Sequence, residues 1–197
     1  MKPARMNRVM TSGALLAIVA TATVACTNSH TTSTPPASTA GKGGAASSTS
    51  VSQVSSLLKT GISQADDKNW SAAEATFERV LSAEPGNVYA NYNLGVIYQT
   101  TGNANEAIAY YDAALAANAT YTPAMYNEAI LLESTQPTEA IAVYEKIVSL
   151  NPKAATAYLR MSLVQAQQGD ASAADANYAK AIKLQPSLKS YKLPAKQ

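Results

Sequence analysis

The two side chains that most often do covalent or metal chemistry, cysteine and histidine, occur once each in this chain of 197 residues, as Cys26 and His30. One cysteine cannot form a disulfide within the chain, and the pair falls short of the three or four protein ligands of a zinc site. The carboxylates Glu128 and Glu133 have the spacing of ordinary helix-surface residues. We therefore expect a binding module, not an enzyme, with no cofactor and no metal.

Cys26 closes an uncharged run of residues, 9–25, that follows a basic start with Lys2, Arg5 and Arg8. This order is the plan of a secretory signal. The end of the run, Thr-Val-Ala-Cys at 23–26, resembles the lipobox of bacterial lipoproteins. The resemblance implies a signal peptide over 1–25, a lipid on Cys26, and an extracytoplasmic protein anchored to a bacterial membrane. The alternative is plain secretion with Cys26 as a free thiol.

The segment 26–50, which follows the signal, begins with the lipidated cysteine and is rich in Ser, Thr, Pro and Gly. Such a composition buries too little apolar surface to fold, so we expect a disordered tether. The full chain has 15 basic and 13 acidic residues, and removal of the signal leaves 12 basic residues. Nucleic acid is therefore not an expected partner.

From residue 51 the apolar residues take helical spacing, and the pattern repeats. An alanine recurs after 34, 33 and 34 residues, and an aromatic follows each alanine four residues later. A small residue recurs upstream, where it would let two helices approach closely. The three sets are Ala73, Ala107, Ala140 and Ala174; Phe77, Tyr111, Tyr144 and Tyr178; and Gly61, Gly95, Ala129 and Ser162.

This pattern resembles the tetratricopeptide repeat, which has a period of 34 residues. The resemblance implies an all-α, right-handed α-solenoid of about four helical hairpins after the tether. The repeat domain would cover 51–187, with repeats near 54–87, 88–121, 122–154 and 155–188, and a short basic tail would cover 188–197. Helices are expected near 52–66, 70–83, 89–100, 104–117, 123–134, 137–150, 154–168 and 171–184. Expected N-caps are Asn69, Asn103 and Asp170, with a capping box between Asn103 and Glu106.

In this family the first helix of each hairpin lines a concave groove, so the resemblance also implies a set of groove residues. Asn93, Asn127 and Arg160 occupy one repeat site, and the two amides would hold the backbone of an extended peptide. Tyrosines and aliphatic residues would flank them: Tyr89, Tyr92, Tyr126, Val96, Ile130 and Leu163. Two alternatives stay open, a structural role for the asparagines and packing of the aliphatic residues between helices.

The leading functional hypothesis is therefore a membrane-anchored adaptor or scaffold that binds a protein or an extended peptide in the cell envelope. The alternative is an accessory subunit in envelope or wall biogenesis that contacts glycan or wall polymer. The two-carboxylate clamp of heat-shock chaperone adaptors is not matched, because Leu58 and Ile62 stand where the clamp needs basic residues.

Overall fold

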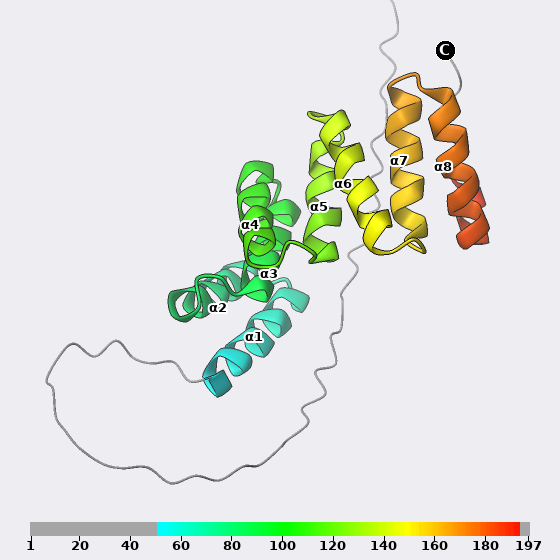
Figure 1. The fold of residues 1–197 in the computed structure, drawn as a ribbon. Helices are drawn as coiled ribbons and strands as arrows, with labels where there is room; N and C mark the ends of the chain where they lie inside the picture. The colour runs from blue at the N-terminus through cyan, green and yellow to red at the C-terminus, as the bar shows by residue number, and fades with distance from the viewer. Residues whose placement is uncertain (1–50, 194–197) are drawn as a thin grey trace, which may run out of the picture. The chain divides into compact units, whose positions relative to one another are not determined.

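The computed structural model describes residues 51–193 (Figure 1). The expected signal peptide, Cys26 and the tether lie outside the described residues, as do residues 194–197. Eight α-helices and one short 3-10 helix make up the described part: α1 (Val51–Asp66), α2 (Trp70–Ala83), α3 (Val88–Thr101), α4 (Ala104–Ala117), α5 (Thr122–Leu132), α6 (Pro137–Leu150), α7 (Ala155–Gln167), α8 (Ala171–Leu184) and η1 (Pro186–Ser190).

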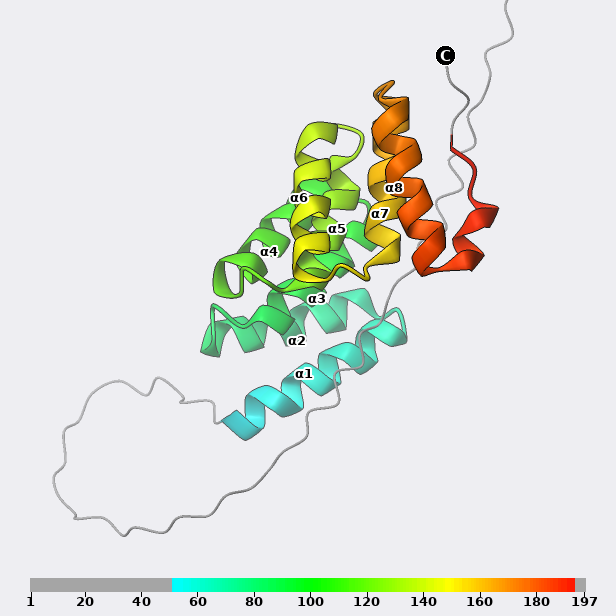
Figure 2. The ribbon, with the colours of Figure 1, turned by 45° about the vertical axis from the view of Figure 1, so that its right-hand side comes forward.

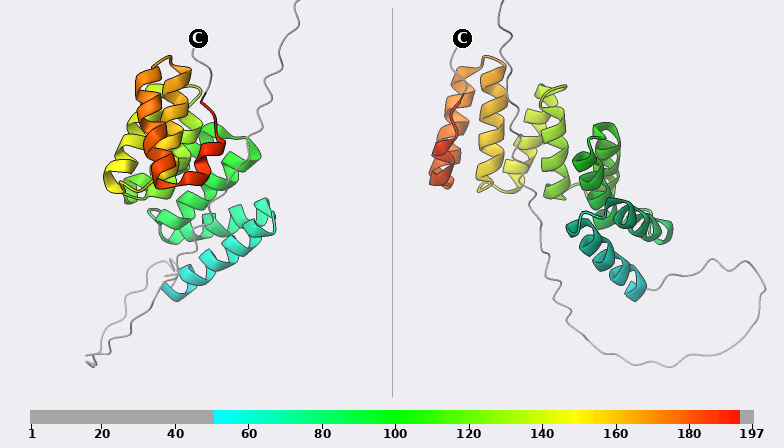
Figure 3. Two further views of the ribbon diagram at one scale, coloured as in Figure 1. Left: turned by 90° about the vertical axis from the view of Figure 1, so that its right-hand side faces the viewer. Right: turned by 180° about the vertical axis from the view of Figure 1, so that it is seen from behind.

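The helices pair as four consecutive hairpins, α1–α2, α3–α4, α5–α6 and α7–α8, and each hairpin packs on the next (Figure 2). The reverse view shows the same succession from α1 to α8 (Figure 3). This confirms the expected all-α, right-handed solenoid for residues 51–193. Every expected helix is present, and no end differs by more than two residues from its expected place.

The recurring alanine and aromatic residues form the inside of each hairpin. Ala107 and Ala140 are fully buried, as are the rings of Tyr111 and Tyr144. In the last repeat the aromatic Tyr178 is only half-buried, because within residues 51–193 only the short segment around η1, and no further hairpin, follows α8. The sequence pattern therefore predicts the tight helix contacts in the first three repeats and most of the contact in the fourth.

The end of the last hairpin is covered by η1. Leu188, which is 6% exposed, packs with Ala155 and Leu159 of α7. The Tyr178 hydroxyl donates a hydrogen bond to the Tyr191 carbonyl at 2.5 Å, which holds the chain after η1 against α8. Leu188 therefore packs with the last repeat, while Tyr191 remains 52% exposed.

Capping of the second helices differs from expectation. Asp170 accepts a hydrogen bond from the Ala173 amide at 3.0 Å, as expected. The side chains of Asn69 and Asn103 make no cap bond, and the capping box predicted between Asn103 and Glu106 is wrong. The Asn103 amide turns instead to the hydroxyl of Thr101 at 3.2 Å, which removes it from the helix end.

Candidate functional site

The nine predicted groove residues all lie on the first helices of their hairpins. We call the surface that they form on α3, α5 and α7 the A-helix face. Tyr89 is exposed (46%), and the other eight are half-buried: Tyr92, Asn93, Val96, Tyr126, Asn127, Ile130, Arg160 and Leu163. Val96 and Leu163 also pack against buried clusters of the core, which favours the alternative of inter-helix packing for these two side chains.

Three tyrosine rings form a cluster that connects α3 with the start of α5. Tyr121 lies edge-on to Tyr89, with ring centroids 5.9 Å apart, and edge-on to Tyr92 at 5.3 Å. Edge-to-face contacts of this kind stabilise aromatic pairs beyond their buried area. We call Tyr89, Tyr92 and Tyr121 the tyrosine cluster. Burial raises the pKa of Tyr121 to about 12, so its hydroxyl stays protonated and can donate a hydrogen bond.

Tyr121 was not among the predicted site residues. It directly precedes α5 and stands in the turn between two repeats, outside the helical positions that the family pattern assigns to the groove. Its place beside Tyr89 and Tyr92 depends on the path of that turn. The only sequence signal for it is an aromatic residue in an otherwise polar turn.

Asn127 bridges the second and third repeats. Its amide nitrogen lies 3.3 Å from the Tyr111 hydroxyl and 3.5 Å from the Tyr92 hydroxyl. The Tyr111 hydroxyl in turn donates to the side-chain oxygen of Gln99 at 2.5 Å. Burial raises the pKa of Tyr111, in keeping with its place inside the hairpin. The amide nitrogen of Asn127 is thus occupied by contacts with the second repeat.

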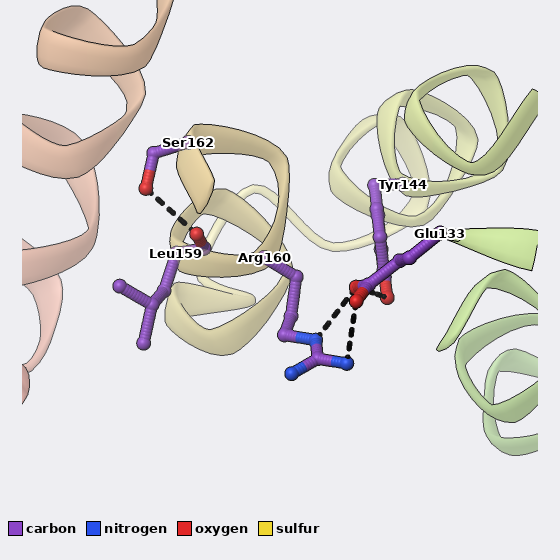
Figure 4. A network of polar contacts seen from close by, with 5 residues as sticks. All are labelled: Glu133, Tyr144, Leu159, Arg160 and Ser162. Carbon is purple, nitrogen blue, oxygen red and sulfur yellow. Dashed lines mark hydrogen bonds and ion pairs between the residues drawn. The ribbon is translucent and has the colours of Figure 1, made fainter. Parts of the chain in front are cut away.

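Arg160 makes the corresponding bridge between the third and fourth repeats (Figure 4). Its Nη2 donates to Glu133 Oε2 at 2.8 Å, and its Nε lies 2.8 Å from Oε1 in an ionic contact not aligned for a hydrogen bond. The Tyr144 hydroxyl donates to the same carboxylate at 2.8 Å. Glu133 is therefore not the ordinary surface residue that the sequence suggested.

Burial and charge oppose each other in this pair. The side chains of Arg160 and Glu133 are 30% and 20% exposed. Burial raises the pKa of Glu133, although Arg160 and Tyr144 work in the other direction. Burial alone would lower the pKa of Arg160, but Glu133 together with Tyr144 and Tyr126 outweighs it, so the pKa rises. The ion pair therefore stands in a partly dehydrated position, where the loss of either partner is costly.

The two bridges share one design. In each bridge a tyrosine hydroxyl donates to an acceptor of its own repeat, and a side chain of the next repeat joins this pair. Asn127 contacts the Tyr111 hydroxyl, which donates to Gln99. Arg160 contacts Glu133, which also accepts from the Tyr144 hydroxyl.

Asn93 stands at the same site of the second repeat but has no such partners. The first repeat offers Phe77, which has no hydroxyl, and Ala65, which has no side-chain acceptor. The Asn93 amide instead donates to the Tyr89 carbonyl of its own helix at 2.7 Å. The structure thus favours a structural role for Asn127 and Arg160, and it leaves Asn93 as the member of the row that does not bridge repeats.

Glu128 on α5 is half-buried, which the sequence did not indicate. Burial raises its pKa to about 7, and the nearby carboxylates Asp112 and Glu139 add to the shift while Lys146 opposes it. Among residues 51–193, no three Cys, His, Asp or Glu side chains are placed to hold a metal ion. Burial and the two neighbouring carboxylates make the charged form of Glu128 unfavourable.

A pH dependence of stability follows from Glu128. Its pKa is higher in the folded chain than in the unfolded chain, so the free energy of unfolding falls as pH rises from about 4.5 to about 7. Glu128→Gln should remove this dependence and stabilise the chain at pH 8 by about 1–2 kcal/mol, after allowance for solvent screening. Urea unfolding at pH 5 and pH 8 measures it. An equal effect of the substitution at both pH values would contradict the assignment, and Glu145→Gln on the exposed side of α6 is the control.

Comparison with known proteins agrees with this arrangement of paired helices. The family model described as "Tetratricopeptide repeat" matches residues 58–122 and 130–188, which is more than half of the chain. The chain belongs to the tetratricopeptide repeat family. Comparison with curated proteins gave no match. Within the described residues, no helix is both long enough and apolar enough to cross a membrane.

Solved structures of the same fold include the crystal structure of MamA. It is 25% identical, has a TM-score of 0.64, and the match covers 70% of this chain and 81% of that chain. YrrB, described as "a TPR protein with an unusual peptide-binding site", is 22% identical with a TM-score of 0.60, over 68% of this chain and 70% of that one. A repeat protein from Parabacteroides merdae is 23% identical with a TM-score of 0.62, over 68% and 54%. The last two likenesses show the fold alone.

Proposed function

We propose that the repeat domain binds an extended peptide segment of another protein on its A-helix face and has no catalytic role. The observation that carries the proposal is the tyrosine cluster. Tyr89 leaves 46% of its surface exposed while its ring is held edge-on against Tyr121. Aromatic side chains that are exposed yet held in place give a partner contact area at little cost in side-chain entropy.

Three further features support a peptide as the ligand. Tyrosine combines an apolar ring with a polar tip, which suits contact with both side chains and backbone. Asn93 lies beside the cluster on α3 and supplies amide groups that do not bridge repeats. YrrB, of the same fold, is described as having a peptide-binding site.

A photo-crosslinking amino acid in place of Tyr89 tests this site in cells. We expect one discrete product in which the label joins one contiguous segment of a partner, as shown by mass spectrometry. The same amino acid in place of Glu145, an exposed residue of α6, is the matched control and should give no such product. Crosslinks scattered equally from both positions would contradict the proposal.

We further propose that the domain is held outside the cytoplasm by a lipid on Cys26, and that it serves there as an adaptor or scaffold in the cell envelope. This rests on the basic start, the apolar run and the Ala25–Cys26 junction. Two or three acyl chains bind a bilayer durably because each buried methylene contributes about 0.8 kcal/mol.

Cys26→Ser tests the anchor separately. The substituted protein has no sulfur to accept the lipid, so we expect it to leave the membrane fraction or to stay at the size of the precursor. Detergent phase partitioning and gel mobility measure both outcomes. Cys26→Ser protein that partitions and migrates like the unchanged chain would contradict lipidation.

A further inference from the structure

The A-helix face carries almost no charge. Helix α3, which holds Tyr89, Tyr92 and Asn93, contains no Asp, Glu, Lys or Arg. Helix α7 contains one charged residue, Arg160. Helix α5 contains Glu128, whose pKa responds to carboxylates on α4 and α6, and it is followed by Glu133.

The two charges that do reach the face neutralise each other. Arg160 and Glu133 are joined by two contacts of 2.8 Å, and the Tyr144 hydroxyl also donates a hydrogen bond to the Glu133 carboxylate. An acidic ligand that captured Arg160 would leave Glu133 half-buried without its cation. A basic ligand that captured Glu133 would leave Arg160 in the same condition. In both cases the free energy gained from the new ion pair is largely offset by the cost of leaving the former partner unpaired.

The tyrosines add no charge of their own. Burial raises the pKa of Tyr92, Tyr121 and Tyr126, so these hydroxyls stay protonated throughout the physiological range. The face therefore offers apolar rings, hydroxyl donors and amides. An ionised side chain pressed against it would lose hydration without gaining a partner.

Building on the proposed function, we infer that the segment bound on the A-helix face is itself uncharged, with apolar or aromatic side chains against the tyrosine cluster and a backbone that pairs with hydroxyl and amide groups. Recognition then depends on shape and on neutral hydrogen bonds. It differs from clamps that read a terminal carboxylate, because the one arginine of this face is already paired.

Selection from a random dodecapeptide display library tests the inference with the full chain in detergent micelles. A parallel selection on Tyr89→Ala identifies the peptides that depend on the face. We expect these peptides to contain Asp, Glu, Lys and Arg at less than half the frequency of the unselected library. The affinity of a selected peptide should change less than about twofold between about 50 and about 500 mM NaCl, since exposed ion pairs are screened over this range.

A second variant separates the inference from the proposed function. Glu133→Gln releases Arg160, and its selected peptides should gain Asp and Glu, with affinity that falls as salt is added. If Glu133→Gln selects the same peptides as the unchanged chain, the ion pair does not exclude acidic ligands and the inference is wrong. If the unchanged chain selects charged, salt-sensitive peptides that Tyr89→Ala loses, the face binds peptides but its neutrality does not select them. If no peptide depends on Tyr89, the proposed function fails.

Discussion

Arg160→Asn is expected to lower the free energy of unfolding by about 2–3 kcal/mol. The substitution leaves Glu133 with 20% of its surface exposed and no cation beside it. Breaking one side of a buried ion pair costs about 3–5 kcal/mol, and the partial exposure of this pair reduces that figure. Tyr144, which donates to the same carboxylate, offsets only part of the loss.

A second substitution should restore the stability lost in Arg160→Asn, because the chain contains an uncharged bridge that can be copied. In the bridge between the second and third repeats the acceptor is Gln99, the hydroxyl belongs to Tyr111, and the bridging side chain is Asn127. Glu133→Gln combined with Arg160→Asn reproduces these residue types around Tyr144. We expect the free energy of unfolding of the double variant to lie within about 1 kcal/mol of that of the unchanged chain, because no uncompensated charge remains.

Denaturant unfolding of both single variants and the double variant gives the interaction energy as a double-mutant cycle. Arg79→Asn, at an exposed site of α2, is the control for the lower helix propensity of asparagine and should cost about 0.5 kcal/mol. A double variant no more stable than Arg160→Asn alone would show that the two inter-repeat bridges are not equivalent.

Sequence reasoning predicted the helices well because the repeat supplies four copies of the same evidence. The recurring alanine and the aromatic four residues later mark the tight side of each second helix, and Ala107, Tyr111, Ala140 and Tyr144 are all fully buried. Turn residues were less informative. The expected caps Asn69 and Asp170 have similar backbone angles, yet only Asp170 accepts a cap bond.

The candidate site was harder to predict because its residues interact across repeats. Asn93, Asn127 and Arg160 are equivalent in the repeat, which suggested a shared role on the face. Their partners belong to the repeat before each of them, and there Phe77 replaces the tyrosine that the other two repeats provide. Aligning each bridging residue with the preceding repeat would have revealed this difference from sequence alone.

The repeat pattern does not predict the burial of individual side chains outside its recurring positions. Glu128 looked like a surface carboxylate because its burial depends on how the neighbouring hairpins pack around α5. Tyr121 joins the tyrosine cluster through the path of one turn. For the proposed lipid anchor, in contrast, all the evidence comes from the sequence, because Cys26 lies outside the described residues.

Gly95→Ala is expected to lower the free energy of unfolding by about 2–3 kcal/mol, although alanine is the better helix former. A methyl group on Gly95 would lie 2.6 Å from the Cδ1 atom of Tyr111, well inside van der Waals contact. The ring is fully buried, and its hydroxyl is held by Gln99 and Asn127. Overpacking costs typically 1–3 kcal/mol, and this site lies at the upper end because the ring has nowhere to move.

The helix propensity of alanine works against this loss by about 1 kcal/mol, so a measured destabilisation is a net effect of the clash. Gly86→Ala is the control, because its added methyl would meet only the Cβ of Ala117 at 3.9 Å. We expect it to change stability by less than about 0.5 kcal/mol. The decisive measurement repeats Gly95→Ala in a Tyr111→Leu background. There the smaller, flexible side chain can yield, and the added methyl should cost less than about 0.5 kcal/mol. An unchanged cost in that background would mean that the aromatic ring is not what requires glycine at position 95.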